Sequence, residues 1–399
     1  MSIFHTASDD EIRSGRTTDV YFVRAKRVLE AKGRDRVRVV AEVTAGGLPD
    51  GAPWGVLCGV EEVARLFEGR PVDVYSMAEG SLFRSSDVHG VRVPVMVVEG
   101  AYCDFSELET PLLGFVCQES GVATRAAVVR IAAGDKPVVA FGARRAHPAL
   151  APALDRAAYI GGLDGVSTLM GAEAIGGEPM GTMPHALIVV FGDQVEAWRA
   201  YDEVLSPEVP RVALVDTYWD EKVEAVRAAE ALGGRLEAVR LDTPGSRRGD
   251  FAGIIREVRW ELDLRGYEGV GIFVSGGLDA EAVRLLGEAG ADGFGVGSWV
   301  SCAPPVDFAF DIVEVEGVPS AKRGKLGGRK QVWRCPGCVV DVVRPFDEGA
   351  PVCPRCGGET EAMLGLLIED GEIVGDLPEP GRIRERVLMQ ISRLGDSGA

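Results

Sequence analysis

Through the central half of the chain, short apolar runs alternate with longer stretches whose apolar residues recur at helical spacing. The runs predict buried parallel strands and the longer stretches predict crossover helices that cover them. Polar clusters are found at the ends of such runs: FGARRAHP (141–148), GGLDGVS (161–167), GTMPH (181–185), LVDTYWDE (214–221), VRLDTPGSRRGD (239–250), FVSGG (273–277) and FGVGS (294–298). The pattern predicts a β/α barrel, in which the chemistry is placed on the loops that follow the strands.

The flanking segments have a different pattern. β-branched runs bounded by Gly or Pro predict strands at 37–43, 72–77 and 91–100, and a long helical stretch begins at Leu112. The expected domains are a strand-rich α+β N-terminal domain at 1–110, rejoined by about 305–333, a barrel with the active site at 111–304, and a zinc ribbon with a C-terminal helix at 334–399.

Composition narrows the classes of function. The 399 residues carry a formal net charge of −18, which argues against a general nucleic-acid binder. The N-terminus has no apolar segment typical of a signal peptide, and no apolar run is long enough to span a bilayer. We therefore expect a cytoplasmic protein that binds neither nucleic acid nor membrane. Basic residues gather locally, which favours a small anionic ligand.

Four of the eight cysteines form two Cys-x-x-Cys pairs separated by fourteen residues. Pairs at this spacing are typical of a closed, structural zinc site with four thiolate ligands. The predicted ligands are Cys335, Cys338, Cys353 and Cys356. Two disulfides, or a ribbon that no longer binds metal, are the alternatives.

Charged residues close several of the predicted strands. Asp216 ends one strand, Arg240 and Asp242 end another, and Arg144 follows a third. A charged side chain at the end of a buried strand needs a partner or a ligand. Arg240 and Asp242 are two residues apart and so share a face, which allows a simple ion pair as the alternative. The planar fork of Arg144 suits phosphate or carboxylate.

His185 is one of only four histidines and follows Thr182 in the GTMPH cluster. We expect a helix that starts here, with Pro184 at its first position after Thr182 or Met183. A histidine at that place can accept or contact a phosphate, or can simply hydrogen-bond its neighbours. Two glycine-rich turns suit phosphate because glycine lets backbone N–H groups approach the oxygens. Their residues are Ser275, Gly276 and Gly277, and Gly295 and Gly297.

With these clusters in order, the chain resembles the nicotinate phosphoribosyltransferases, in particular the archaeal branch with a C-terminal zinc knuckle. The resemblance covers essentially the whole chain, from TTDVYF (17–22) through GTMPHALI, LVDTYWDEK, VRLDTPGSRRGDF and IFVSGGLD to AKRGKLGGRKQV (321–332). It implies a type II phosphoribosyltransferase-like α/β barrel. The implied reaction joins nicotinate to phosphoribosyl pyrophosphate in NAD biosynthesis or salvage, with ATP as co-substrate and Mg²⁺ held by the substrate phosphates.

The resemblance also implies residue roles. His185 would be phosphorylated in the ATP-coupled cycle, with Asp216 beside it and Asp242 near the ribose. Arg144, Arg240 and the two glycine-rich turns would hold phosphates. The pyridine ring would contact Phe141, Ser167 and, across the interface of a homo-oligomer, Tyr21 of a neighbouring subunit. The basic loop at 322–330 would contact pyrophosphate or ATP.

Three alternatives remain open. Quinolinate phosphoribosyltransferase has the same barrel but needs further basic residues for a second carboxylate. Nicotinamide as the acceptor is the second alternative, because one pocket contact can decide between acid and amide. The third, from a different class, is a zinc-ribbon adaptor whose barrel has lost activity.

Overall fold

The computed structural model describes residues 3–396, which divide into two compact units. The first unit holds the chain up to Thr124, residues 160–162 and the chain from Ala303 onward. The second unit holds 125–159 and 163–302. The described part of 334–399 therefore falls within the first unit. Among the described residues, no helix is both long and apolar enough to cross a membrane.

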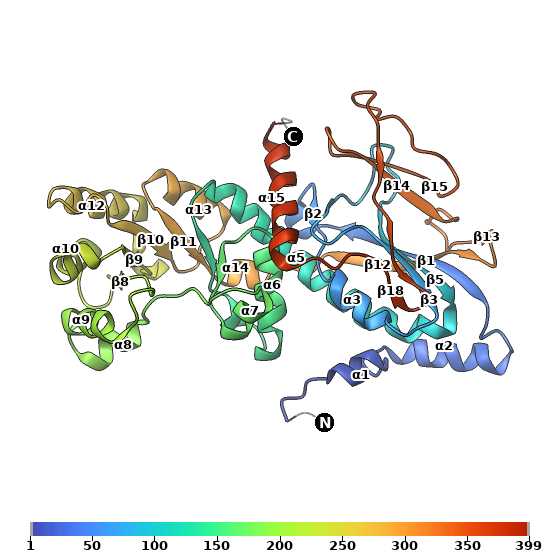
Figure 1. The fold of residues 1–399 in the computed structure, drawn as a ribbon, viewed down its shortest axis with the longest axis horizontal. Coiled ribbons are helices and arrows are strands. Elements are labelled where there is room, and N and C mark those ends of the chain that lie inside the picture. The colour runs from blue at the N-terminus through green and yellow to red at the C-terminus, as the bar shows by residue number, and fades with distance from the viewer. Residues whose placement is uncertain (1–2, 397–399) are drawn as a thin grey trace. The chain divides into compact units, whose positions relative to one another are not determined.

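The first unit is built on an antiparallel sheet in the order β13-β12-β1-β5-β3-β17-β18 (Figure 1). The strands are β1 (Arg38–Gly47), β3 (Val72–Ser76), β5 (Pro94–Ala101), β12 (Asp307–Val315), β13 (Val318–Pro319), β17 (Gly365–Glu369) and β18 (Glu372–Ile373). The three predicted N-terminal strands are confirmed as β1, β3 and β5. Strands β12 and β17 come from the C-terminal part of the chain and pair with β1 and β3.

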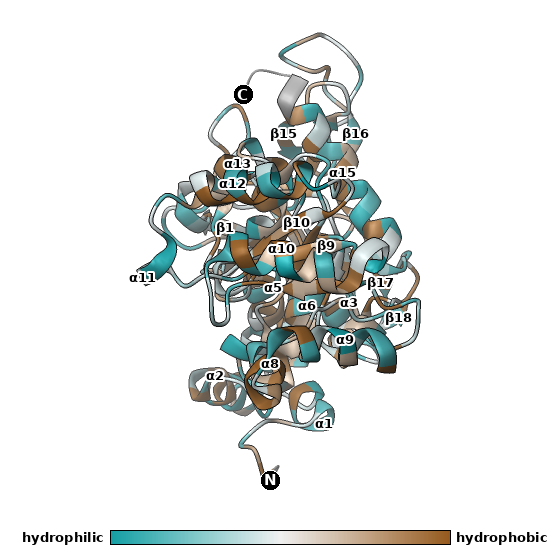
Figure 2. Ribbon diagram, turned by 90° about the vertical axis from the view of Figure 1, so that its left-hand side faces the viewer, coloured by the Kyte–Doolittle hydropathy of each residue, from teal (hydrophilic) through white to brown (hydrophobic). Residues whose placement is uncertain are grey.

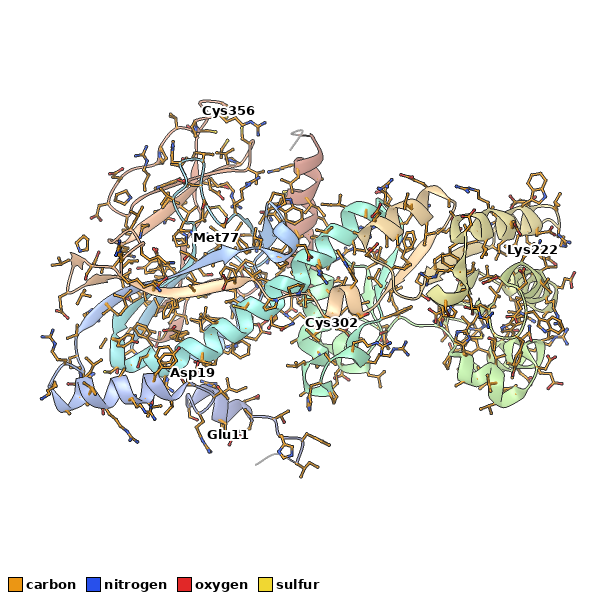
Figure 3. All side chains as sticks on the ribbon, turned by 180° about the vertical axis from the view of Figure 1, so that it is seen from behind. Glu11, Asp19, Met77, Lys222, Cys302 and Cys356 are labelled. Atoms are coloured by element: carbon orange, nitrogen blue, oxygen red, sulfur yellow. The ribbon has the colours of Figure 1, made fainter. Side chains whose placement is uncertain are left out.

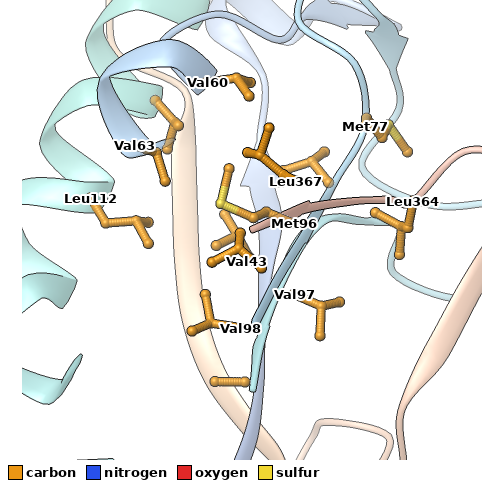
Figure 4. Packing of buried hydrophobic residues seen from close by; sticks show 14 of the residues in the cluster. Val43, Val60, Val63, Met77, Met96, Val97, Val98, Leu112, Leu364 and Leu367 are labelled. Carbon is orange, nitrogen blue, oxygen red and sulfur yellow. The ribbon is translucent and has the colours of Figure 1, made fainter. Parts of the chain in front are cut away.

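The core of this unit lies where helices pack on the sheet (Figure 4). Val43 and Met96 from the strands, Val63 from α3 (Val60–Phe67) and Leu112 from α5 (Glu109–Ala133) all belong to one cluster and are completely buried. Burial of a side chain of this size contributes about 1.5–3 kcal/mol. Helix α5 confirms the helical stretch predicted from Leu112.

The other elements of this unit are short, apart from two helices. They are α1 (Asp9–Arg13), α2 (Val20–Ala31), η1 (Pro49–Gly51), β2 (Gly55–Val56), β4 (Leu82–Phe83), α4 (Tyr102–Phe105), η2 (Ser106–Leu108), β14 (Lys330–Cys335), β15 (Val340–Pro345), β16 (Glu361–Ala362) and α15 (Pro380–Asp396). Strands β15, β14 and β16 form a separate small sheet. Helix α15 is the predicted amphipathic C-terminal helix, and Ile383, Val387 and Ile391 bury its apolar face.

The second unit is built on six parallel strands in the order β7-β6-β11-β10-β9-β8. The strands are β6 (Val138–Ala140), β7 (Gly165–Val166), β8 (Val212–Leu214), β9 (Ala238–Leu241), β10 (Gly271–Ser275) and β11 (Gly293–Val296). Because β11 pairs with β6, the strands follow one another cyclically, as in a β/α barrel. The predicted alternation of strands and helices is confirmed.

Helices and short 3₁₀ turns follow these strands. They are η3 (Ala143–Arg145), η4 (Pro148–Leu150), α6 (Ala151–Ile160), α7 (Leu169–Ala174), α8 (His185–Phe191), α9 (Gln194–Val204), α10 (Glu221–Leu232), η5 (Gly233–Arg235), α11 (Gly245–Arg248), α12 (Phe251–Asp263), α13 (Ala280–Glu288) and α14 (Ser298–Ser301). Asp220, Asp250 and Asp279 cap α10, α12 and α13 by accepting backbone N–H bonds.

The GTMPH cluster does not end a strand, in contrast to the prediction. Residues 177–184 form an irregular segment between α7 and α8. The amide of Met180 donates to the carbonyl of Val166 in β7 at 2.8 Å. Two prolines and three glycines in 176–184 disfavour a continuous ladder here. Along the sequence this segment lies between β7 and β8, and these two strands do not pair with each other in the described chain.

The helix after this segment also differs from the prediction. Pro184 is the N-cap residue, with φ −84° and ψ 154°, and His185 is the first helical residue. The expected helix is split into α8 and α9 at Gly192, whose φ of 77° ends the first of them. Helix α8 is coloured as hydrophobic over most of its length in Figure 2, and its Val189 and Val190 are exposed.

Candidate active site

A cavity of about 360 Å³ opens at the carboxyl ends of the parallel strands. Its volume lies within the range of small-molecule sites. Eleven predicted site residues line it: Phe141, Arg144, Ser167, Thr182, Arg240, Asp242, Ser275, Gly276, Gly277, Gly295 and Gly297. Arg145, Gly181, Met183, Pro184 and Ser298 complete the lining. The residues come from the ends of five different strands and from the irregular segment, so the fold brings together side chains far apart in sequence.

His185 and Asp216 lie beside this cavity and contact its charged wall. The Nε2 atom of His185 is 3.7 Å from Asp216 Oδ1 and 3.7 Å from Asp242 Oδ2. Its Nδ1 atom is 3.1 Å from the hydroxyl oxygen of Thr217. Asp216 Oδ2 accepts the backbone N–H of Asp242 at 2.9 Å, which ties the ends of β8 and β9 together.

Arg240 is a largely buried cation of the site. Its side chain is 11% exposed, and its Nη2 atom is 3.5 Å from Asp242 Oδ2, so the ion pair considered as an alternative does form. Nη1 donates to the hydroxyl of Thr182. Nε is buried and has no hydrogen-bond partner among the described residues. The ion pair does not exclude a ligand role, because both side chains also line the cavity.

The electrostatic environment shifts the pKa values of the Asp216 and Asp242 carboxyl groups in opposite directions. Burial raises the pKa of Asp216 to about 6, and the nearby Asp242 adds to this increase. Burial alone would raise the pKa of Asp242 as well, but hydrogen bonds with His185 and Ser275 and the charge of Arg240 hold it below its usual value. The Asp242 carboxylate raises the pKa of His185, and burial offsets this only in part. Two neighbouring carboxyl groups with pKa values pushed apart are typical of functional sites.

One glycine in each glycine-rich turn has little room for a side chain. Gly276 has a φ of +93°, and an added Cβ would lie 2.7 Å from Arg248 Nη2 and 3.0 Å from Asp242 Oδ1. At Gly295, an added Cβ would lie 2.3 Å from the ring of Phe141. The hydroxyl of Ser275 donates to Asp242 Oδ1 at 2.7 Å. The turn after β10 is therefore packed directly against the end of β9.

The sequence alone did not single out Arg248, Thr217 or Glu224. The guanidinium of Arg248 donates to the carbonyls of Thr243 at 2.8 Å, Ser275 at 3.2 Å and Gly276, and so joins two loops of the site. Arg247 beside it is exposed, and no sequence signal distinguishes the two. Thr217 directly follows Asp216 in the LVDTYWDE cluster, and this position could have identified it as a candidate site residue. Glu224 has the sequence context of an ordinary helix residue.

Tyr21 and the basic loop belong to the first unit, whereas the cavity-lining residues belong to the second. Tyr21 is 57% exposed on α2. Within the loop, Lys322 and Lys325 pair with Asp311 at 2.5 and 2.7 Å, and the buried Lys330 pairs with Glu42 at 2.9 Å. Arg329 pairs with Glu99 at 2.6 Å and stacks on Tyr75 and Phe346. Much of the loop's positive charge is therefore balanced within this unit.

The four cysteines of the two Cys-x-x-Cys pairs gather around one point. Their sulfur atoms all lie within 4.8 Å of one another, and Cys335 Sγ is 3.7 Å from Cys356 Sγ. Tetrahedral zinc with Zn–S bonds of about 2.3 Å requires sulfur separations of about 3.8 Å. Cys356 lies in the loop beyond the strands of the small sheet (Figure 3). The donor set therefore fits a metal ion.

Asp216→Asn is expected to stabilise the fold at neutral pH. The Asp216 side chain is 2% exposed, and its Oδ1 has no hydrogen-bond partner among the described residues. Since its folded pKa of about 6 exceeds the ordinary value of 3.8, the folded state keeps a proton that the unfolded state releases. The free energy of unfolding contributed by this group therefore falls as pH rises from about 4 to about 6. We expect the variant to be more stable by about 1–3 kcal/mol above pH 6.

Urea unfolding at several pH values measures this effect. The stability difference between Asp216→Asn and the unaltered protein should be largest at pH 7.5 and should shrink toward pH 4. Asp220→Asn is the matched control, because Asp220 is an exposed helix cap in the same loop and asparagine caps equally well. A difference that does not change with pH would contradict the assigned cause.

Known proteins share this architecture. The N-terminal and C-terminal domains of the quinolinate phosphoribosyl transferase family match residues 19–120 and 122–311. The nicotinate phosphoribosyltransferase pncB1 of Mycobacterium tuberculosis is 30% identical over 371 residues, 82% of this chain and 79% of the relative. The crystal structure of nicotinate-nucleotide pyrophosphorylase from Pyrococcus furiosus is 55% identical over 99% of both chains, with a TM-score of 0.95. Human nicotinic acid phosphoribosyltransferase, 21% identical with a TM-score of 0.74 over 94% of both chains, shares the fold.

The two matched domains, with a cavity at the strand ends, define a phosphoribosyltransferase of the quinolinate type of fold. Within this class, the chain belongs to the nicotinate phosphoribosyltransferase family. The family, the fold type and the enzyme class predicted from the sequence are confirmed.

Proposed function

We propose that this chain transfers the phosphoribosyl group of phosphoribosyl pyrophosphate to nicotinate, giving nicotinate mononucleotide and pyrophosphate. The observation that carries the proposal is the cavity in which a largely buried Arg240, the Asp242 carboxylate and two glycine-rich turns meet at the ends of parallel strands. The ring nitrogen of nicotinate forms a bond to ribose C1, and the bond from C1 to the pyrophosphate oxygen breaks with its electron pair on pyrophosphate.

The chain's own residues have separate parts in this step. Arg240 and Arg144 offset the negative charge that develops on pyrophosphate, and the turns at Gly276 and Gly295 offer backbone N–H groups to phosphate oxygens. Asp242, held ionised by its neighbours, stabilises the cation-like ribose. Phe141 and Ser167 receive the pyridine ring. Mg²⁺ would be bound mainly by the substrate phosphates.

We also propose that ATP is a co-substrate that phosphorylates His185. The histidine lies outside the cavity lining but is 3.7 Å from Asp242, so added charge on it would be felt at the ribose site. One imidazole nitrogen forms a bond to the γ-phosphorus, and the bond to ADP breaks with its electron pair on ADP. Water later takes the phosphoryl group and restores the histidine.

Two further parts of the proposal concern a structural metal ion and the oligomeric state. Cys335, Cys338, Cys353 and Cys356 would hold a structural zinc ion, since four thiolates leave no open coordination position. The exposed Tyr21 would complete the nicotinate site of a second copy of the chain, which makes a homo-oligomer the working form.

Pyrophosphate release tests the function directly. The protein is supplied with phosphoribosyl pyrophosphate, Mg²⁺ and either nicotinate, nicotinamide or quinolinate, each with and without ATP. Turnover with nicotinate that ATP increases is the expected result. Turnover only with nicotinamide or only with quinolinate would assign that compound, and not nicotinate, as the substrate. No turnover with any of the three would favour an inactive adaptor.

A further inference from the structure

A buried carboxylate outside the cavity holds the loop next to His185. Glu224, in the first turn of α10, is completely buried. Its Oε2 accepts the backbone N–H of Thr217 at 3.1 Å, and its Oε1 accepts those of Tyr218 at 2.8 Å and Trp219 at 2.7 Å. Three charge-assisted hydrogen bonds compensate the cost of burying this group and fix the course of the loop.

The same loop carries groups on both sides of the histidine ring. The Thr217 hydroxyl lies 3.1 Å from Nδ1, and Asp216 Oδ1 lies 3.7 Å from Nε2. A histidine ring rotates easily about its terminal torsion, and a half-turn puts Cδ2 in the place of Nδ1 and Cε1 in the place of Nε2, so both nitrogens lose their partners. A ring held at both nitrogens keeps one orientation. Phosphoryl transfer to a nitrogen requires such an orientation, because a misplacement of about 1 Å can cost about 100-fold in rate.

We infer that Glu224 and Thr217 are positioning residues for His185 and that they act on ATP coupling rather than on phosphoribosyl transfer. This inference rests on the proposed phosphorylation of His185. Glu224 fixes the Thr217 backbone, and the Thr217 side chain fixes the imidazole. Neither residue lines the cavity, so the transfer of the phosphoribosyl group does not depend on them directly.

Glu224→Gln isolates the first link of this chain of contacts. The amide oxygen of glutamine can replace Oε1 and keep the hydrogen bonds from Tyr218 and Trp219. The amide nitrogen then faces the Thr217 N–H, so two donors oppose each other and the loop is released at that residue. Glu221→Gln is the matched control, because Glu221 is also a buried carboxylate in α10 but, within residues 3–396, its side chain accepts a hydrogen bond from the Thr243 hydroxyl alone, which an amide oxygen can still accept.

Thr217→Val and Thr217→Ser test the second link. Valine keeps the shape and removes the hydroxyl, whereas serine restores the hydroxyl. His185→Ala is measured beside them. Two readouts are taken for each protein: acid-labile ³²P transferred from γ-labelled ATP to the protein, and pyrophosphate release from nicotinate and phosphoribosyl pyrophosphate without ATP.

We expect Glu224→Gln and Thr217→Val to lower the rate of phosphoprotein formation by about 10- to 100-fold. Basal turnover without ATP should stay within about threefold, and Thr217→Ser and Glu221→Gln should resemble the unaltered protein. If His185→Ala abolishes labelling while Thr217→Val and Glu224→Gln keep it, the positioning roles are overturned and the proposed function stands. If His185→Ala keeps both the labelling and the stimulation by ATP, the proposed role of His185 fails and this inference fails with it. Equal losses of basal turnover and labelling would also overturn the positioning roles.

Discussion

Arg240→Met is expected to lower kcat for pyrophosphate release by about 100- to 1,000-fold. Arg240 is a largely buried cation of the cavity, and its guanidinium contacts both Thr182 and Asp242. In a site from which water is excluded, a fixed positive charge stabilises negative charge on a leaving group far more than it does in water. Methionine keeps the length of the side chain but supplies neither charge nor donor.

Steady-state kinetics with nicotinate and phosphoribosyl pyrophosphate measure this effect. Loss of Arg240 also removes the partner of a part-buried carboxylate, so the melting temperature is followed together with activity. Arg284→Met is the control, because Arg284 is exposed on α13 and its ion pair is with Glu288 one turn away. If Arg240→Met kept more than about a tenth of the activity while remaining folded, its part in stabilising the leaving group would be excluded.

The cavity residues could be predicted because parallel strands bring their carboxyl ends to one edge. Arg144, Ser275 and Gly295 lie at the ends of separate strands, yet all three line the cavity. Arg144 and Gly295 are more than a hundred residues apart in the sequence. The two-residue spacing of Arg240 and Asp242 placed both side chains on one face, and the observed distance of 3.5 Å agrees. These relations depend only on strand direction and pleat.

Sequence spacing did not separate the functional members of each cluster from the structural ones. Asp250 and Asp279 lie in the same kind of cluster as Asp242, but they cap the helices that follow. Asp164 of the GGLDGVS cluster directly precedes β7 and does not follow a strand, and it accepts hydrogen bonds from Arg130 at 2.7 Å and from the Val138 amide at 2.8 Å. A carboxylate after a strand can turn toward the cavity or toward a helix start, and the loop's path decides which.

The sequence pattern also did not predict contacts that depend on the path of a loop. Arg248 reaches three carbonyls because α11 ends at Gly249, whose φ of 52° turns the chain. Pro184 caps α8 rather than opening it, since residues 177–184 run as an irregular segment beside β7. Neither outcome follows from residue preference, because each is decided by tertiary contacts.

Cys353→Ser is expected to unfold the small sheet of β14, β15 and β16 locally. If the four cysteines bind zinc as proposed, the binding free energy is folding free energy for the residues around the ion, and isolated zinc modules gain about 10–16 kcal/mol in this way. The turn at 336–339 would lose its anchor. In that turn, the Val339 carbonyl accepts a hydrogen bond from Arg84 at 2.6 Å. The Pro336 carbonyl accepts one from Arg393 of α15 at 3.1 Å.

Metal content and hydrogen exchange together measure this outcome. The unaltered protein should contain one zinc per chain and Cys353→Ser much less, with rapid amide exchange at 330–362 and in the last turns of α15. Amides of the parallel strands β9 and β10 should stay protected, because their hydrogen bonds do not involve the cysteine cluster. Cys302→Ser is the control, since Cys302 is an exposed cysteine outside the cluster. Slow exchange at 330–362 in a zinc-free Cys353→Ser variant would show that the small sheet is held by its side-chain contacts, among them the buried Arg334–Asp341 pair at 2.6 Å, and not by a metal.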